Sequence, residues 1–171
     1  MTPRDNDPAT PVSLEPAVLR SVFGAFPTGV TAVAARVDGQ PVGMAASSFT
    51  AVSLVPPLVS VCVGAESATW PTLAGAHRVG ISVLAEEQGE LCRQLSRRGV
   101  DRFAGVAWHD SPDGAVFVRG AAAWLECTLY DQLPAGDHHI VLFEVHRLGA
   151  DAAVTPLVFH GSRFRRLHAA S

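Results

Sequence analysis

The stretch from Pro41 to Gly64 constrains the fold most, because two strand-like runs in it are joined by small, hydroxyl-bearing residues and a double proline. The run 41–46 is small and apolar, and residues 47–50 then place three hydroxyls beside one aromatic ring. The prolines at 56–57 fix an extended start for the apolar run 58–63. Small residues let a flat ligand lie close to the backbone, and hydroxyls and free N–H groups can donate to its polar atoms. The pattern predicts either a ledge for such a ligand or a plain barrel hairpin whose serines cap a turn.

The length of 171 residues is enough for one domain with a sizeable core. Residues 1–12 carry three prolines among polar residues, so we expect a disordered N-terminal arm and a single domain over residues 13–168. No run approaches the roughly 20 apolar residues of a membrane helix, and the N-terminus lacks the apolar segment of a signal peptide. These features predict a cytoplasmic protein without a membrane partner.

The charged and sulfur-bearing residues exclude several classes of protein. The chain contains no lysine, which pyridoxal phosphate enzymes and Walker A loops need. Cys62, Cys92 and Cys127 are odd in number and widely spaced, which favours reduced thiols over a disulfide framework or a zinc site. A net charge of −3 gives no electrostatic reason to expect nucleic acid.

A helix and paired strands are expected in the first third of the chain. Apolar residues at helical spacing follow Ser13, a plausible N-cap, and continue to Gly24. Asp38-Gly39 is a strong hairpin signal between the runs 29–37 and 41–46, so these strands should pair antiparallel.

The rest of the chain alternates short helices with strands, and the long run at 116–133 should bend near Gly120 because it is too long for one flat strand. About six antiparallel strands with two or three short helices predict a mainly β fold, a β-barrel with helical caps. The remaining elements are expected at 58–63 (strand), 67–75 (helix capped by Ser67), 78–84 (strand), 86–98 (helix), 101–105 (loop), 138–148 (strand) and 157–160 (strand).

One group of side chains stands out as reactive. The quartet Gly136-Asp137-His138-His139 would put two imidazoles and a carboxylate at the mouth of a hairpin. A histidine there can hydrogen-bond an amide or donate a proton. A turn histidine satisfied by Asp137 explains the quartet as well.

A second candidate is Arg102, which can anchor a phosphate together with the hydroxyls of Ser67 and Thr69. An ion pair with Asp101 or Glu86 is the alternative. The other histidines share no spacing typical of metal ligands, so no metal site is expected.

Six short motifs are distributed over these segments. They are FPTGVTAV (26–33), GMAASSFTAVSLVPPLVSVCV (43–63), DRFAG (101–105), LEC (125–127), GDHHIVLFEV (136–145) and PLVFHGSRF (156–164). Together and in this order they resemble the flavin reductase family with the FMN-binding split β-barrel, the reductase components of two-component flavin-dependent monooxygenases. The resemblance covers residues 19–167.

The resemblance implies an antiparallel split barrel of Greek-key type that binds FMN or FAD. NADH or NADPH would reduce the flavin, and the reduced flavin would be supplied to a partner monooxygenase. No catalytic acid or base is strictly required, because hydride transfer is the chemistry of the two cofactors. The family also implies a homodimer with each flavin near the subunit interface.

The resemblance also assigns roles to individual residues. The isoalloxazine and ribityl chain would lie along Met44, Ala45, Ala46, Ser47 and Ser48, with Cys62, Val63 and Gly64 opposite. The phosphate end would be held by Ser67, Thr69 and Arg102, and the nicotinamide by His138 and Phe164.

Two departures from the family pattern bear on this site. Many relatives have threonine where Ala45 stands, so one flavin contact would have to come from a backbone N–H. Phe143 stands where glycine is common and is expected to narrow the nicotinamide pocket.

Two other functions are compatible with the sequence. The chain would then be a flavin-retaining oxidase or reductase of the same barrel class, or a non-catalytic flavin-binding protein. Measurements of flavin dissociation and of NADH and NADPH oxidation distinguish these two functions from the flavin reductase.

Overall fold

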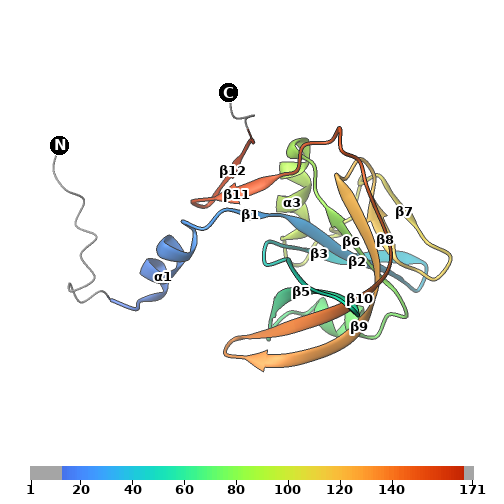
Figure 1. Ribbon diagram of the computed structural model, residues 1–171, viewed down its shortest axis with the longest axis horizontal. Coiled ribbons are helices and arrows are strands. Elements are labelled where there is room, and N and C mark those ends of the chain that lie inside the picture. The colour runs from blue at the N-terminus through green and yellow to red at the C-terminus, as the bar shows by residue number, and fades with distance from the viewer. Residues whose placement is uncertain (1–12, 168–171) are drawn as a thin grey trace.

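The computed structural model describes residues 13–167, and a seven-stranded antiparallel sheet forms its centre (Figure 1). The strand order is β3-β2-β6-β9-β10-β5-β4, so the hairpins β2–β3, β4–β5 and β9–β10 are joined through β6 and through pairing of β5 with β10. This arrangement confirms the predicted mainly β barrel. The strands are β2 Thr31–Val37, β3 Gln40–Ala46, β4 Thr50–Leu54, β5 Pro57–Gly64, β6 Val79–Val83, β9 Ala123–Ala135 and β10 His138–Ala150.

Smaller elements surround this sheet. A three-stranded sheet and a two-stranded hairpin flank it, and no helix within residues 13–167 has the length and hydropathy to span a bilayer. The small sheet contains β1 Thr28–Gly29, β11 Val158–His160 and β12 Arg163–Arg165, and the hairpin contains β7 Trp108–Asp110 and β8 Val116–Val118. The helices are α1 Pro16–Phe23, α2 Trp70–Ala74, the 3-10 turn η1 Glu86–Gln88 and α3 Gly89–Leu95.

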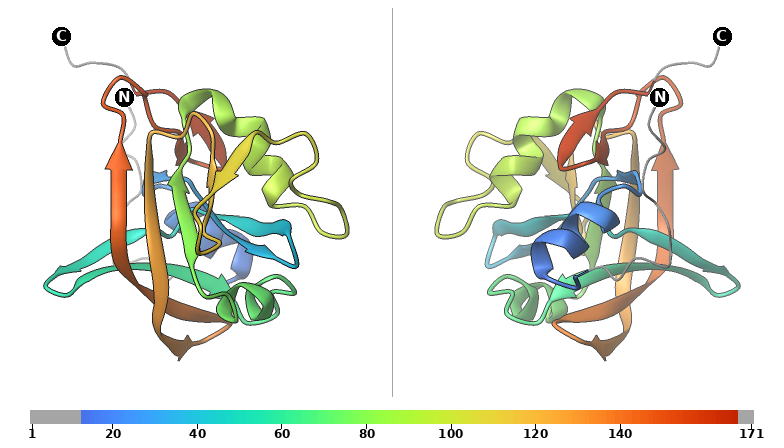
Figure 2. Two further views of the ribbon diagram at one scale, coloured as in Figure 1. Left: turned by 90° about the vertical axis from the view of Figure 1, so that its right-hand side faces the viewer. Right: turned by 90° about the vertical axis from the view of Figure 1, so that its left-hand side faces the viewer.

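Strand β2 is buried on both faces and separates two cores. Val33 and Ala35 face one core with strands β5, β6 and β10, and α2 covers this core through Trp70 and Leu73. Ala32 and Ala34 face the second core, which α3 and β8 cover. Figure 2 shows α2 and α3 at opposite ends of the barrel. Burial on both faces explains why β2 reads as a continuous run of small apolar residues.

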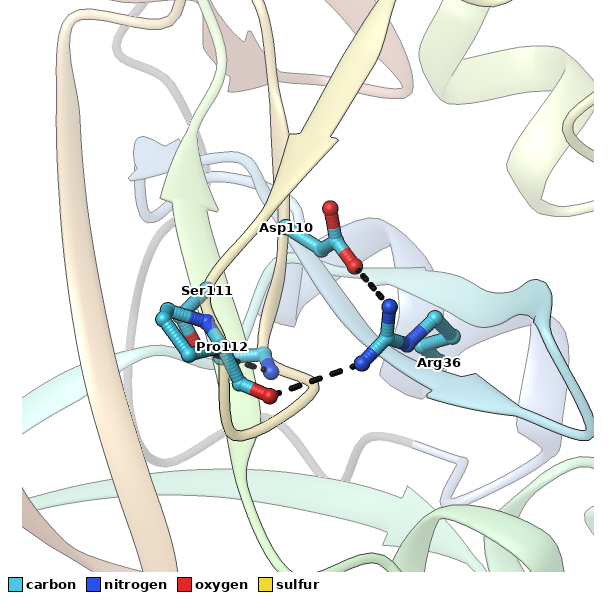
Figure 3. A network of polar contacts seen from close by, with 5 residues as sticks. Arg36, Asp110, Ser111 and Pro112 are labelled. Atoms are coloured by element: carbon cyan, nitrogen blue, oxygen red, sulfur yellow. Dashed lines mark hydrogen bonds and ion pairs between the residues drawn. The ribbon is translucent and has the colours of Figure 1, made fainter.

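The β7–β8 hairpin is fastened to the end of β2 by polar contacts (Figure 3). The Arg36 guanidinium forms an ion pair with Asp110 at 2.7 Å and donates to the carbonyl oxygen of Pro112 at 3.5 Å. The Ser111 hydroxyl accepts a hydrogen bond from the backbone N–H of Ala115 at 3.2 Å. These contacts keep β8 over the second core.

The Asp38-Gly39 turn is confirmed. Both residues have positive φ angles, 50° and 77°, as a two-residue hairpin turn of type I′ requires. The turn sets the register that pairs Thr31 with Ala46, and the Thr31 hydroxyl donates to the Ala46 carbonyl oxygen at 2.9 Å. The last residues of β3 are therefore held in place.

Several sequence expectations need correction. The bend expected near Gly120 is present, with φ at 73°, but it divides the run 116–133 into two strands, because β8 pairs with β7 instead of continuing into β9. The helix expected at 86–98 is a 3-10 turn followed by α3, which ends at Leu95. Strands β4 and β12 were not expected. The arm predicted for residues 1–12 lies outside the described residues.

Phe143 is fully buried in the first core, and its ring meets Trp70 edge-on with the centroids 6.0 Å apart. It lines none of the cavities described below, so the expectation that it narrows a nicotinamide pocket is wrong. Its side chain points into the barrel because Val141, Phe143 and Val145 share the inward face of β10.

We expect Phe143→Ala to lower the free energy of unfolding by about 3–5 kcal/mol, because it leaves a cavity in a closely packed core. Urea denaturation measures this change. Leu148→Ala on the same strand removes a side chain that is 68 % exposed and should change stability by less than about 0.5 kcal/mol. Equal effects of the two substitutions would contradict this description of the core.

Candidate functional site

A ledge of small residues forms where β3 leaves the sheet and approaches β5. The Ser48 hydroxyl accepts a hydrogen bond from the Cys62 backbone N–H at 2.8 Å and donates to the Cys62 carbonyl oxygen at 3.2 Å. Both backbone groups of Cys62 are thereby satisfied, and residues 44–48 are fixed beside 62–64. We call these two segments the ledge.

Three cavities open along the ledge, and Ala45 lines all of them. The central cavity, of about 320 Å³, is lined by residues 44–48, residues 62–64, Ser67 and His138. The large cavity, of about 890 Å³, extends from Met44 past Thr69 and Arg102. The arginine cavity, of about 680 Å³, lies on the side of Ala45, Ala46 and Ser47 that meets α3 and β12.

Arg102 is fixed in the large cavity by backbone and side-chain acceptors. Its guanidinium donates to the Gly43 carbonyl oxygen at 3.0 Å, to the Thr69 hydroxyl at 2.8 Å and to the Arg97 carbonyl oxygen at 2.5 Å. Burial, and secondarily the charge of Arg98, lower the pKa of Arg102, which stays charged at neutral pH because an arginine pKa starts above about 12. Such a preoriented cation suits a phosphate group.

The ion pairs considered as alternatives for Arg102 do not form. The Asp101 carboxylate accepts from the Phe103 backbone N–H at 2.9 Å, and Glu86 pairs with Arg166 at 3.2 Å. The structure does bring Arg102 together with Ser67 and Thr69, since all three line the large cavity.

Ser67 connects the ledge to α2. Its hydroxyl accepts from the Trp70 backbone N–H at 3.2 Å and lies 3.9 Å from the Met44 sulfur. The Ser67 side chain therefore bonds the first residue of α2, but the helix is shorter than the expected 67–75 and its N-cap residue is Thr69, not Ser67. Ser67 also lines the central and large cavities.

His138 lies at the rim of the central and large cavities. The turn at Gly136, where φ is 64°, starts β10 at this residue. The His138 Nδ1 lies 2.8 Å from the Asp137 carboxylate, and this hydrogen bond lowers the pKa of Asp137. The contact between Asp137 and the imidazole that the second interpretation expects is therefore present, and none of the described residues bonds the Nε2 of His138. His139 lies on the other face of β10, where its Nδ1 is buried without a partner among residues 13–167.

Phe164 lines a different cavity from His138. It borders the arginine cavity, where its ring packs on Phe159 with centroids 5.6 Å apart and lies beneath the Arg93 guanidinium at 4.9 Å. None of the three cavities is therefore lined by both of the residues that the resemblance assigned to nicotinamide. Sequence spacing could not show this, because β12 was not expected.

The ledge suits a flat ring for three reasons. A Cβ built on Gly64 would meet no atom within 4 Å, so the space above this residue is open. Ala45 and Ala46 add only methyl groups along the opposite segment. None of the described residues pairs with the hydroxyl of Ser47, which is exposed beside them and can donate to a ligand.

Sequence analysis missed several lining residues. Glu66, Arg98 and Asp101 border the large cavity, and Arg93, Arg97 and Arg163 border the arginine cavity. Arg93 and Arg97 are four residues apart, a spacing that places two side chains on one face where α3 runs into the next turn. In the helix expected at 86–98, that spacing was the feature of the sequence that could have predicted two neighbouring arginines at one site.

Known proteins share this sequence and this fold. Residues 23–168 match the model of the flavin reductase like domain. A flavin reductase of Pseudomonas putida is 36 % identical over 149 residues, which cover 86 % of this chain and 88 % of the relative. The reductase subunit HsaB of a flavin-dependent monooxygenase from Rhodococcus jostii is 36 % identical over 152 residues, with 89 % and 78 % covered.

A solved structure agrees. An NADH:FAD oxidoreductase of Streptomyces globisporus, in complex with NAD and FAD fragments, superposes with a TM-score of 0.87 at 40 % identity and covers 94 % of this chain and 98 % of its own. The barrel, the ledge and these matches lead to one conclusion: the chain belongs to the flavin reductase family.

Proposed function

We propose that the protein is an NAD(P)H-dependent flavin reductase that reduces FMN or FAD and supplies the reduced flavin to a partner monooxygenase. The observation that carries the proposal is the small-residue ledge, which connects three open cavities at Ala45. Two nucleotides can reach such a ledge from different sides. The relatives that reduce flavins, including a monooxygenase reductase subunit, support the same activity.

The ledge holds the flavin in this proposal. The isoalloxazine and ribityl chain lie along Met44, Ala45, Ala46, Ser47 and Ser48, opposite Cys62, Val63 and Gly64. Ser67, Thr69 and Arg102 hold the phosphate end in the large cavity. When bound, the flavin supplies the ring nitrogen that accepts a hydride from reduced nicotinamide. The missing hydroxyl at Ala45 is compensated by the neighbouring Ser47 hydroxyl and by backbone donors.

The protein's own residues position the reactants and supply no proton. The central cavity is lined by apolar side chains, hydroxyls, one thiol and a single imidazole. His138, whose Nδ1–H donates to the Asp137 carboxylate, accepts at Nε2 a hydrogen bond from the carboxamide NH2 of the nicotinamide. Correct placement of two reactants can supply much of the rate for such a step.

A homodimer is part of this proposal. Helix α1 has eight residues and buries none of them, and Figure 1 shows it standing apart from the barrel. A helix this short is marginal in water without tertiary contacts. Phe23 and Phe26 are 70 % and 74 % exposed there, and Leu54 and Val55 at the β4–β5 turn are each 91 % exposed. A second copy of the chain would cover these apolar surfaces.

We also infer a cytoplasmic location. Cys62, Cys92 and Cys127 are all free thiols, which are typical of reducing compartments.

Oxidation of NADH and of NADPH, followed by the near-ultraviolet absorbance of the reduced nicotinamide, tests the activity with FMN and FAD each added. Turnover with a flavin that separates from the protein on gel filtration supports the proposal. A flavin retained through the column would indicate the flavin-retaining alternative, and absence of turnover with either nucleotide would leave a binding protein.

His138→Ala should raise the KM for the nicotinamide nucleotide by about tenfold, the effect of losing one good hydrogen bond. Flavin affinity, measured by quenching of flavin fluorescence, should change by less than about twofold. His139→Ala is the matched control, because His139 lines none of the cavities. Unchanged kinetics of His138→Ala would remove this residue from the site.

Gly64→Val separates folding from flavin binding. The strand tolerates the substitution because a Cβ at this position meets open space. The same side chain would occupy the space assigned to the ring, so we expect the flavin Kd to rise by at least about tenfold with an unchanged melting temperature. Wild-type flavin affinity in Gly64→Val would show that the ring lies elsewhere.

Sedimentation velocity tests the homodimer. We expect about twice the mass of one chain at micromolar concentration, and a weaker dimer after Leu54→Asp, which puts a charge into the apolar contact. A wild-type chain that sediments as a monomer at every concentration would exclude the homodimer without affecting the assignment of the ledge.

A further inference from the structure

The arginine cavity collects positive charge without a lining carboxylate. Arg93, Arg97 and Arg163 border it, and its other lining residues are apolar, hydroxyl-bearing or a thiol. The large cavity, by contrast, is bordered by two arginines and by three acids, Glu66, Asp101 and Asp137. In a chain whose net charge is −3, three arginines around one acid-free cavity indicate an anion site.

The arginines differ in what already binds them. Arg93 forms an ion pair with Glu90 and lies over the Phe164 ring at 4.9 Å, so its position is fixed. Among residues 13–167, Arg97 and Arg163 have no carboxylate partner. Both residues are exposed and line the cavity, so their guanidinium groups can donate to a ligand there.

Two elements far apart in the sequence build this site. Arg97 follows α3, and its carbonyl oxygen accepts from Arg102, which ties it to the large cavity. Arg163 begins β12 directly after a turn in which Gly161 and Ser162 have φ angles of 58° and 60°. Phe159 and Phe164 pack together beneath this turn and form the apolar floor. The two free arginines therefore come from two distant segments, the chain just after α3 and the start of β12, that meet at this cavity.

The arginine cavity and the large cavity are neighbours that border different parts of the ledge. Ala45 and Ser96 line both, and the Ala46 and Ser47 side of the ledge belongs to the arginine cavity. A flavin whose phosphate end is bound at Thr69 and Arg102 leaves the arginine cavity free. A second nucleotide that places its nicotinamide on the ledge would extend its diphosphate there.

We propose that the arginine cavity binds the diphosphate of the nicotinamide dinucleotide, with Arg97 and Arg163 as the phosphate ligands and Arg93 as a fixed neighbouring charge. This inference rests on the proposed function and adds a residue set that determines affinity for the nicotinamide nucleotide. Guanidinium groups suit the task because they donate two parallel hydrogen bonds to phosphate oxygens. The FAD diphosphate offers the same chemistry, and the experiment separates the two sources.

ADP-ribose is the probe, because it carries the diphosphate without the nicotinamide ring. Isothermal titration of ADP-ribose into the protein, with and without FMN, gives its Kd. We expect Arg97→Gln and Arg163→Gln each to raise this Kd by about tenfold, since each removes one charge-assisted contact. Arg165→Gln on the same strand is the matched control and should leave it unchanged, because Arg165 lines none of the three cavities.

The second part of the experiment measures the Kd of FMN and of FAD for the same three variants. Unchanged Kd values for both flavins support the assignment to nicotinamide. A selective loss of FAD affinity in Arg97→Gln and Arg163→Gln would overturn it and assign the cavity to the flavin diphosphate. Wild-type ADP-ribose binding in both variants, an equal loss in Arg165→Gln, or no binding of ADP-ribose to the wild-type protein would also overturn it.

Failure of the proposed reductase activity and failure of the proposed diphosphate site give different experimental results. ADP-ribose binding needs no turnover, so a protein that binds the probe through Arg97 and Arg163 but never oxidises NADH or NADPH would contradict the reductase activity alone. A protein that reduces flavin while both variants bind ADP-ribose normally would contradict the diphosphate site alone.

Discussion

The hydrogen bonds between Ser48 and Cys62 hold together the part of the molecule on which the site depends. Strands β3 and β4 are the two edges of one seven-stranded sheet, yet only residues 47–49 separate them in the chain. The sheet must therefore curl until its edges meet, and the Ser48 hydroxyl bonds both backbone groups of Cys62 at the meeting point. An unpaired backbone group there would be costly, because edge strands otherwise leave donors and acceptors unsatisfied. The ledge is a direct product of this closure.

Closure with small residues explains how a chain with few reactive side chains can serve redox chemistry. Ala45, Ala46 and Gly64 leave room for a flat ring. The cationic side chains lie elsewhere, at Arg102 in the large cavity and at the three arginines of the arginine cavity. In the proposed function, the charged groups bind the phosphate ends of the nucleotides, and the surface against which the reaction takes place carries almost no charge. Binding geometry then determines which atoms meet, which is the contribution that a protein makes to cofactor-based hydride transfer.

Local signals predicted the parts of the fold that local interactions determine. The Asp38-Gly39 turn, the antiparallel pairing of the strands on either side of it and the Ser67 contact to α2 follow from turn chemistry, strand periodicity and hydroxyl hydrogen bonding. The length of the run 116–133 predicted the bend near Gly120, but the separation into β8 and β9 depends on the pairing of β8 with β7, which the sequence of the run does not show. Ser67, Thr69 and Arg102 line one cavity, whereas Phe164 and His138 line different cavities. The arginine cavity joins α3 to β12, so only the tertiary structure reveals it.

The most direct test of the ledge is the alkylation rate of Cys62 with and without FMN, measured by mass spectrometry of the modified peptides. Cys62 is exposed and lines the central cavity, whereas Cys127 is buried, and burial together with the neighbouring Glu126 charge raises its pKa to about 12. A flavin on the ledge should slow modification of Cys62 at least about tenfold, since only the accessible thiolate reacts, and Cys127 should stay unmodified in both samples. Modification of Cys62 at the same rate with saturating FMN bound would show that the ring lies elsewhere and would contradict the account.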